Sequence, residues 1–281
     1  MKNRSAALQC GLINLVRFLK RRHPPRQNGI EGEVAVLRVI LGDQLSPKMS
    51  SLHDADKGRD TILICEVQRE ALYVKHHKKK LVFVFSAMRH FAKELQNANY
   101  RVIYNRLDDP VQLSCFSDAV TRAAKMADFD EIVVTEPSEY RVLEEIKLWP
   151  DLLNLPIDIR PDTRFLASHS DFQSWSAGRK SLRMEYFYRD MRKRYTILME
   201  GDQPIGGQWN FDSDNRKAPN STIAIPDTFR SAPDDITQEV CTMVERLFPD
   251  HIGTATPFHF AVTANGARAA LQQFVEERLT Y

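Results

Sequence analysis

The sequence has few cysteines and no pair of them at a metal-binding spacing. Cys10, Cys65, Cys115 and Cys241 lie far apart in the 281 residues, and none belongs to a C-x-x-C motif. The sequence therefore predicts neither a zinc ribbon nor a disulfide framework. We expect reduced thiols in a cytoplasmic protein and assign no metal-binding residue.

The sequence also lacks a large excess of charge of one sign. Lys and Arg number 39 and Asp and Glu number 37, which gives a net charge of +2. This balance excludes a protein that coats polyanions with its whole surface, so any contact with nucleic acid must come from a local patch. Hydrophobic residues make up 43%, which is enough to exclude disorder as the dominant state.

No apolar run near the N-terminus is long enough to span a membrane. The apolar stretch at residues 6–19 is interrupted by Gln9, Asn14 and Arg17, and a basic tract follows it at residues 20–26. A signal peptide would carry its basic residues before the apolar core. We therefore expect residues 1–33 to be a flexible extension and the protein not to be membrane-bound. Attraction of this extension to an anionic surface is the alternative.

Three common motifs of nucleotide and acyl chemistry are missing as well. The sequence contains no G-x-G-x-x-G, no G-x-x-x-x-G-K-[ST] and no G-x-S-x-G. Their absence argues against an ordinary NAD-binding or P-loop domain and leaves no nucleophile to name. We assign no catalytic residue.

What the sequence does contain, over residues 34–165, is an alternation of short apolar runs with helical patterns. β-Branched apolar runs of this length suit strands that are buried on both faces, as in a parallel sheet. The alternation predicts an α/β domain built on a doubly wound parallel sheet. Strands are expected at residues 34–41, 61–67, 81–85, 102–104, 131–135 and 157–159.

Helical spacing of apolar residues continues beyond this domain. Residues 166–226 are expected to be a long connector with one helix near 182–199, and residues 227–281 to be part of an all-helical domain. That last part either docks on the α/β domain or begins a larger helical domain, because its 55 residues would form only a marginal core alone. Ser86 and Thr263 are expected to cap helices.

Polar side chains follow the first two predicted strands, where ligands bind in open parallel sheets. The carboxylates among them disfavour a triphosphate and favour a neutral ligand rich in hydroxyl groups. Each of these residues could instead be an ordinary loop or cap residue. The candidates are Gly42, Asp43 and Gln44 after the first strand, and Glu66, Glu70 and Tyr73 after the second.

Two basic clusters could contact phosphate groups. Residues 75–80 form the first cluster, which could instead be an ordinary solvent-exposed surface without a ligand. Arg179–Arg194 forms the second, and aromatic residues such as Trp175 and Tyr186 are interleaved with its charges. Such a mixture suits base stacking. We favour the alternative, a helix whose aromatic residues pack inward and whose arginines pair with the acidic rim of the sheet.

Several stretches, taken in order, resemble the bacterial deoxyribodipyrimidine photolyase-related proteins. These form the iron–sulfur branch of the photolyase/cryptochrome superfamily, which includes bacterial (6-4) photolyases. The resemblance covers nearly everything from about residue 36 onward. Its stretches are Leu41–Pro47, Cys65–Val67 with Glu70, His76–Lys80, Phe85–Phe91, Arg164–Phe165, Gly178–Arg189 and Gly206–Asp212.

The resemblance implies an α/β antenna domain, a connector and an all-helical domain that holds FAD and an iron–sulfur cluster. It implies light-driven electron transfer from reduced FAD to a pyrimidine lesion in DNA. Family chains continue beyond the last helix here, so we expect FAD and the cluster to belong to a missing half and this chain to be inactive alone. A 6,7-dimethyl-8-ribityllumazine-type antenna is expected on the six candidates above, with Cys65 and Phe85 as further wall residues, and Glu70 as the main contact.

Three functions remain open. The first is a light-harvesting module that binds the pigment, and the second is the intact (6-4) photolyase if the sequence is part of a longer protein. The third is a nucleotide-binding regulatory domain without photochemistry. DNA is expected to bind through the absent domain or weakly through Arg179–Arg194, and the oligomeric state stays open.

Overall fold

A computed structural model describes residues 34–213, 216, 218 and 226–279. The predicted N-terminal extension lies outside these residues. The chain divides into two compact units. The first, which we call the sheet unit, runs to Arg160 and resumes at Phe229, and the second, the connector unit, is Pro161–Thr228.

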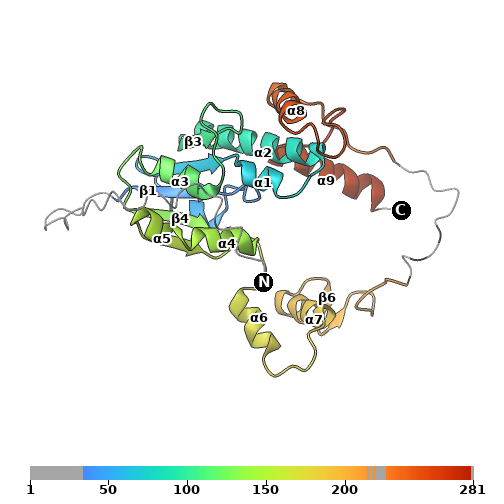
Figure 1. Cartoon of the computed structure of the whole chain (residues 1–281). Coiled ribbons are helices and arrows are strands. Elements are labelled where there is room, and N and C mark those ends of the chain that lie inside the picture. The colour runs from blue at the N-terminus through green and yellow to red at the C-terminus, as the bar shows by residue number, and fades with distance from the viewer. Residues whose placement is uncertain (1–33, 214–215, 217, 219–225, 280–281) are drawn as a thin grey trace, which may run out of the picture. The chain divides into compact units, whose positions relative to one another are not determined.

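The sheet unit contains a five-stranded sheet in the order β3-β2-β1-β4-β5 (Figure 1). Every neighbouring pair of strands in it is parallel. The predicted α/β fold with a doubly wound parallel sheet is confirmed, because helices cover both faces of the sheet. The strands are β1 (Val36–Ile40), β2 (Thr61–Cys65), β3 (Arg101–Asn105), β4 (Glu131–Thr135) and β5 (Ile157–Arg160).

Alternate residues of each central strand supply two separate apolar clusters. In β2, Ile62 and Ile64 pack with α2 (Lys78–Asn97) and α8 (Asp235–Leu247), whereas Leu63 packs on the opposite face. That alternation is the period-2 geometry of a strand, and burial on both faces explains why the runs are almost wholly apolar. The helices of the opposite face are α3 (Phe116–Ala123), α4 (Tyr140–Ile146) and α5 (Trp149–Leu153).

The prediction of a strand at residues 81–85 is wrong, because these residues lie in α2. The N-terminus of α2 is capped by His77, whose Nδ1 accepts a hydrogen bond of 3.1 Å from the backbone N–H of Lys79. Phe85 and Met88 share the buried face of α2, as their helical spacing requires. Ser86, expected to be the cap, is instead fully buried in the middle of this helix.

The remaining helical segments follow the sequence pattern more closely. Thr263 does cap the last helix, since its Oγ1 accepts a hydrogen bond of 3.1 Å from the N–H of Gly266. Helix α8 packs against α2, and Lys78 joins them through a 2.5 Å ion pair with Glu245. The other elements are α1 (Gln68–Leu72), η1 (Ser50–Leu52), α6 (His169–Ser176), α7 (Met184–Tyr195), β6 (Met199–Glu200), β7 (Gln203–Pro204) and α9 (Ala264–Arg278).

Within the described part of the chain, every helix is too short or too polar to cross a lipid bilayer.

Candidate functional site

The order of the strands defines where a ligand would bind. From β1 the chain moves outward to β2 and β3, and later returns to the other side of β1 to form β4 and β5. In open parallel sheets the crevice at such a reversal, beyond the carboxyl ends of the strands, is the usual ligand site. The segments after β1, β2 and β4 therefore meet at one edge of this sheet.

An ion pair between Glu70 and Arg141 joins two of these segments. Both carboxylate oxygens of Glu70, in α1 after β2, accept hydrogen bonds of 2.8 Å from the guanidinium of Arg141, in α4 after β4. Because β1 lies between β2 and β4, this pair spans the edge at which β1 ends. The two side chains are 27% and 30% exposed, so the pair is accessible from solvent.

Two further side chains complete this group. Glu139 accepts a 3.0 Å hydrogen bond from Nε of Arg141, and the guanidinium lies 4.7 Å from the ring centroid of Tyr73. Hydrogen bonds to Glu70 raise the pKa of Arg141, so its charge persists at all physiological pH values. A carboxylate has about four acceptor positions. Arg141 occupies two at Glu70, which leaves room for hydroxyl groups.

Glu66, by contrast, is fully buried and its acceptor positions are filled. Its Oε1 accepts from Nε of Arg89 (2.8 Å) and the hydroxyl of Tyr104 (2.6 Å). Its Oε2 accepts from Nη2 of Arg89 (3.1 Å) and the N–H of Leu107 (2.8 Å). Burial would lower the pKa of Arg89, but the hydrogen bonds and charge of Glu66 outweigh it and raise that pKa. These contacts fix the turn between β2 and α1, which carries Glu70.

The candidates after β1 contribute to the shape of the edge. The amide of Gln44 is fully buried and donates to the carbonyls of Thr135 (3.1 Å) and Glu136 (3.3 Å), so it ties the segment after β1 to that after β4. A Cβ at Gly42 would lie 3.1 Å from Sδ of Met88, which explains why glycine allows the segment to approach α2. Asp43 is exposed.

Cys65 and Phe85 lie on opposite faces of the sheet. Cys65 packs in the cluster with α3, whereas Phe85 belongs to the cluster with α2 and α8. Burial raises the pKa of the Cys65 thiol, so it stays protonated and apolar in character. The structure therefore does not bring these two residues together as walls of one pocket.

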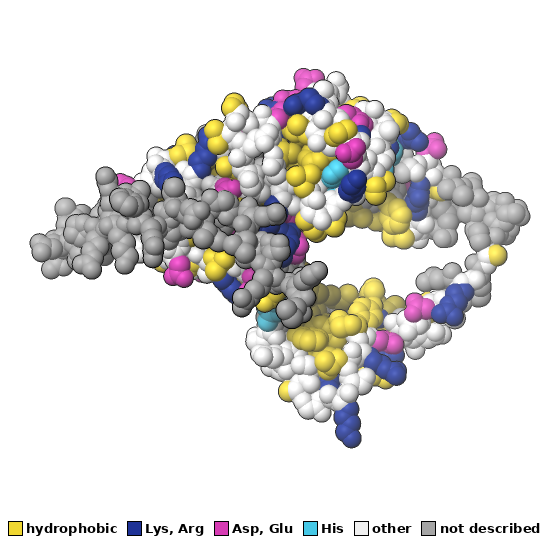
Figure 2. Space-filling model, viewed as in Figure 1, with side chains coloured by type: hydrophobic (Ala, Val, Ile, Leu, Met, Phe, Trp, Pro, Cys, Tyr) yellow, Lys and Arg dark blue, Asp and Glu magenta, His cyan; other side chains and the backbone are white. Residues whose placement is uncertain are grey.

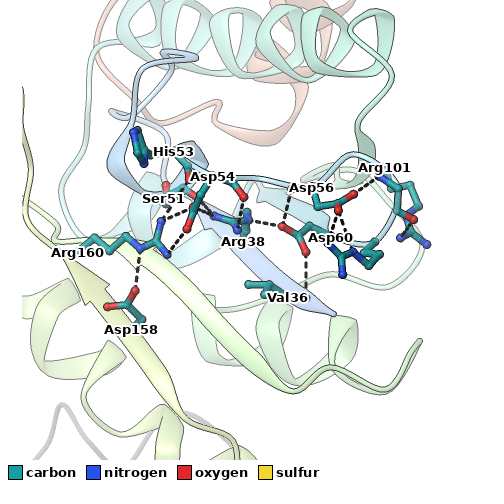
Figure 3. Close-up of polar contacts among 12 residues, drawn as sticks. Val36, Arg38, Ser51, His53, Asp54, Asp56, Asp60, Arg101, Asp158 and Arg160 are labelled. Atoms are coloured by element: carbon teal, nitrogen blue, oxygen red, sulfur yellow. Dashed lines mark hydrogen bonds and ion pairs between the residues drawn. The ribbon is translucent and has the colours of Figure 1, made fainter. Parts of the chain in front are cut away.

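Sequence reasoning missed Arg141. The available signal was a cationic side chain in the first turn of α4, the helix that follows β4, and β4 is the strand next to β1. It also missed a partly buried network (Figure 3), in which Arg38 of β1 donates a 2.7 Å hydrogen bond to Asp60 and a 3.0 Å one to Asp54. Arg160 of β5 donates to the same oxygen of Asp54 at 2.7 Å. This network fastens residues 50–60 onto the sheet.

In the connector unit, several of the arginines pair with carboxylates of the same unit. Arg194 pairs with Asp171 at 2.8 Å, and Arg179 pairs with Asp190 at 3.5 Å. Among the residues that the structure describes, no group of three or more His, Cys, Asp or Glu side chains is placed to hold a metal ion. We therefore derive no step through an iron–sulfur cluster.

Comparison with known proteins agrees with the resemblance seen in the sequence. The chain matches the family described as deoxyribodipyrimidine photo-lyase-related protein over residues 38–260. A (6-4) photolyase of Agrobacterium fabrum is 50% identical over 243 residues, which are 86% of this chain and 48% of that protein. An uncharacterized protein of Acanthamoeba polyphaga mimivirus is 25% identical over 177 residues, 59% of this chain and 88% of the viral protein. The chain thus spans about half the length of the (6-4) photolyase.

Proposed function

Because the chain belongs to the deoxyribodipyrimidine photo-lyase-related protein family, we propose that its sheet unit binds an antenna pigment at the carboxyl edge of the sheet. Membership in this DNA-repair family favours a chromophore of the flavin or pterin type. Within that class we propose a 6,7-dimethyl-8-ribityllumazine-type pigment, a pteridine that carries a chain of hydroxyl groups. Its role is light harvesting.

The Glu70–Arg141 pair beside Tyr73 is the observation that carries this proposal. The acceptor positions left on Glu70 suit ribityl hydroxyl groups, and the N–H groups of Arg141 suit the carbonyl oxygens of a pteridine ring. Tyr73 is 51% exposed and offers an aromatic surface next to both. When bound, the pigment would supply absorption of near-ultraviolet or blue light, while the protein binds and orients it.

Glu66 supports the same site indirectly. With its acceptor positions filled by Arg89, Tyr104 and Leu107, it acts as a positioning residue for the turn that leads into α1, the helix of Glu70. Gln44 holds the neighbouring segment in the same way. We propose (6-4) photolyase activity only for a protein that also holds FAD and an iron–sulfur cluster, groups to which we assign no residue here. Contact with DNA through Arg179–Arg194 is proposed as weak.

Titration of the purified chain with 6,7-dimethyl-8-ribityllumazine, followed by pigment fluorescence, tests the site. Glu70→Ala should weaken binding by about 1–3 kcal/mol, the usual cost of losing a hydrogen bond to a charged group. Glu144→Ala is the matched control, because Glu144 is an exposed carboxylate of α4 that pairs with Lys147 instead of Arg141. Equal affinity of the Glu70→Ala and wild-type proteins would overturn the assignment.

A second titration, with an adenine nucleotide, distinguishes pigment binding from the alternative function of a nucleotide-binding regulatory domain. Binding of an adenine nucleotide at this edge, together with no binding of the lumazine, would favour the nucleotide-binding regulatory domain. In that case Glu70→Ala should not weaken the binding, because a carboxylate repels phosphate groups.

A further inference from the structure

The connector unit contains a cleft of about 540 Å³ between α7 and the segment 205–212. Three aromatic side chains line it, Tyr188, Trp209 and Phe211, together with the apolar side chains of Leu198 and Ile205. Clefts of this size and composition are typical of sites for small organic groups. Its lining residues all belong to the connector unit, so this cleft shares no residue with the proposed pigment site.

Cations surround the indole of Trp209. The charged groups of Arg189, Arg192 and Lys193 lie 5.3, 5.5 and 5.5 Å from the centroid of its ring. All three project from α7, and Arg192 is the one among them that also lines the cleft. An aromatic ring next to several cations is the combination that stacks a base and neutralises the phosphate attached to it.

One of these cations is fixed in place before any ligand binds. Arg192 is only 7% exposed, and its guanidinium donates to the carbonyls of Ile197 (Nε to O, 3.1 Å) and Leu198. A side chain held in this way loses little conformational entropy when it meets an anion. The cation at the wall is therefore preorganised.

The cleft is also lined by polar side chains that can accept hydrogen bonds, one from α7 and three from the segment 205–212. Glu185 and Asp212 supply carboxylates, and Gln208 and Asn210 supply amides. Asn210 is oriented by a 3.2 Å hydrogen bond from its Nδ2 to Oε1 of Glu185. Carboxylates accept from the exocyclic amino group of cytosine, and amides can both donate and accept. An apolar peptide side chain would leave these groups without partners.

From these contacts we propose that the cleft holds a nucleobase, stacked on Trp209, whose phosphate lies against the basic side of α7. Two sources share this chemistry, a free mononucleotide and an unpaired nucleotide of a DNA strand. The inference does not rest on the pigment site, because no residue is common to both.

The test uses the full chain and a fluorescein-labelled single-stranded octanucleotide of mixed sequence, followed by fluorescence anisotropy. Trp209→Ala should weaken binding about tenfold or more, and Trp209→Phe, which keeps a ring, should lose at most about threefold. Lys193→Ala should weaken binding more than Arg179→Ala. These two variants remove the same charge, but Arg179 stacks on Trp175, whereas Lys193 lies next to Trp209.

Two controls keep the result decisive. Hydrogen exchange in α7 should be unchanged in Trp209→Ala, which shows that the connector unit remains folded. Unchanged lumazine affinity in this variant separates the proposal from the pigment site. If Trp209→Ala does not fold, Tyr188→Ala replaces it, with a smaller loss of oligonucleotide affinity expected.

Competition by free dCMP identifies the source of the nucleobase. Displacement of the oligonucleotide by dCMP indicates a site for a mononucleotide, and no displacement indicates a site for a DNA strand. Equal binding by Trp209→Ala and wild type, or equal losses in Lys193→Ala and Arg179→Ala, would overturn the proposal.

Discussion

The two units of the chain differ in how much they bury. In the sheet unit, two apolar clusters pack on opposite faces of the sheet, and residues such as Leu63 and Ile132 are fully buried. In the connector unit, Arg192 and Pro204 are the buried residues among those that the structure describes. Figure 2 shows a broad area of hydrophobic side chains on the surface of the connector unit.

The connector unit is instead held by ring contacts and ion pairs. Phe172, Trp175 and Phe187 form a triad with ring centroids 5.0–5.7 Å apart, which joins α6 to α7. Trp175 also donates a 2.8 Å hydrogen bond to Asp190. A unit of this size with so little burial has marginal stability by itself. The difference is consistent with our proposals, in which the sheet unit is the rigid scaffold and the connector unit binds a ligand through exposed aromatic and basic side chains.

The largest expected effect is on the buried Arg38–Asp60 ion pair of the sheet unit. Asp60→Ala leaves Arg38 buried without the carboxylate that lies 2.7 Å from its Nε. Loss of one partner of a buried pair costs about 3–5 kcal/mol, and we expect the lower end because Asp54 stays in contact with Arg38. Urea unfolding followed by circular dichroism measures the loss.

The double variant Arg38→Met/Asp60→Ala separates the buried charge from the packing. Because it removes the uncompensated charge, it should be more stable than Asp60→Ala alone. A double variant that is less stable than the single one would mean that the contacts of Arg38 with Asp54 and with the carbonyl of Ser51 (2.8 Å), not the unpaired charge, dominate.

An intermediate effect is expected at the triad of the connector unit. Phe187 is partly buried, so Phe187→Ala should cost about 1–2 kcal/mol, less than the 3–5 kcal/mol typical of a fully buried phenylalanine. The loss should be local. Hydrogen exchange should become faster in α6 and α7 and remain unchanged in β1 and β2. Faster exchange throughout the sheet would contradict the independence of the two units.

The sequence allowed the central strands to be predicted because a strand buried on both faces must be apolar at every position, as at Ile62, Leu63 and Ile64. The same rule failed at residues 81–85. A run of five apolar residues is also what the buried part of a helix contains, and length and flanking residues must decide between the two. Here the capping side chain of His77 lies just before the run, so the helix begins at Lys78.

The candidate site was predictable only in part, for a related reason. The rule about strand ends identified Glu70 from its place after β2 alone. Arg141 lies 71 residues farther along the chain, and its contact with Glu70 depends on β2 and β4 flanking β1. The hydrogen bonds that fill the acceptor positions of Glu66 likewise come from Tyr104 and Arg89. No local sequence pattern predicts that these two residues contact Glu66.

The smallest expected effect is a dependence on pH that distinguishes the two units. In the sheet unit, burial and the nearby Lys80 lower the pKa of His76 below its usual 6.5, and His251 adds to this, although Glu70 opposes it. The folded state then binds this proton less tightly than the unfolded state does. Stability is complete above pH 6.5 and falls as the pH drops from there toward the folded-state pKa.

Urea unfolding of the sheet unit at pH 7.5 and 5.5 measures this loss, which should stay below about 1 kcal/mol because the imidazole is partly solvated. His76→Gln should remove it. In the connector unit, hydrogen bonds from Ser168 and Arg194 lower the pKa of Asp171, so its ion pair persists over the same range. Hydrogen exchange in α6, corrected for the intrinsic effect of pH, should therefore not change. Acid sensitivity that survives in His76→Gln would assign the titration to a group other than His76.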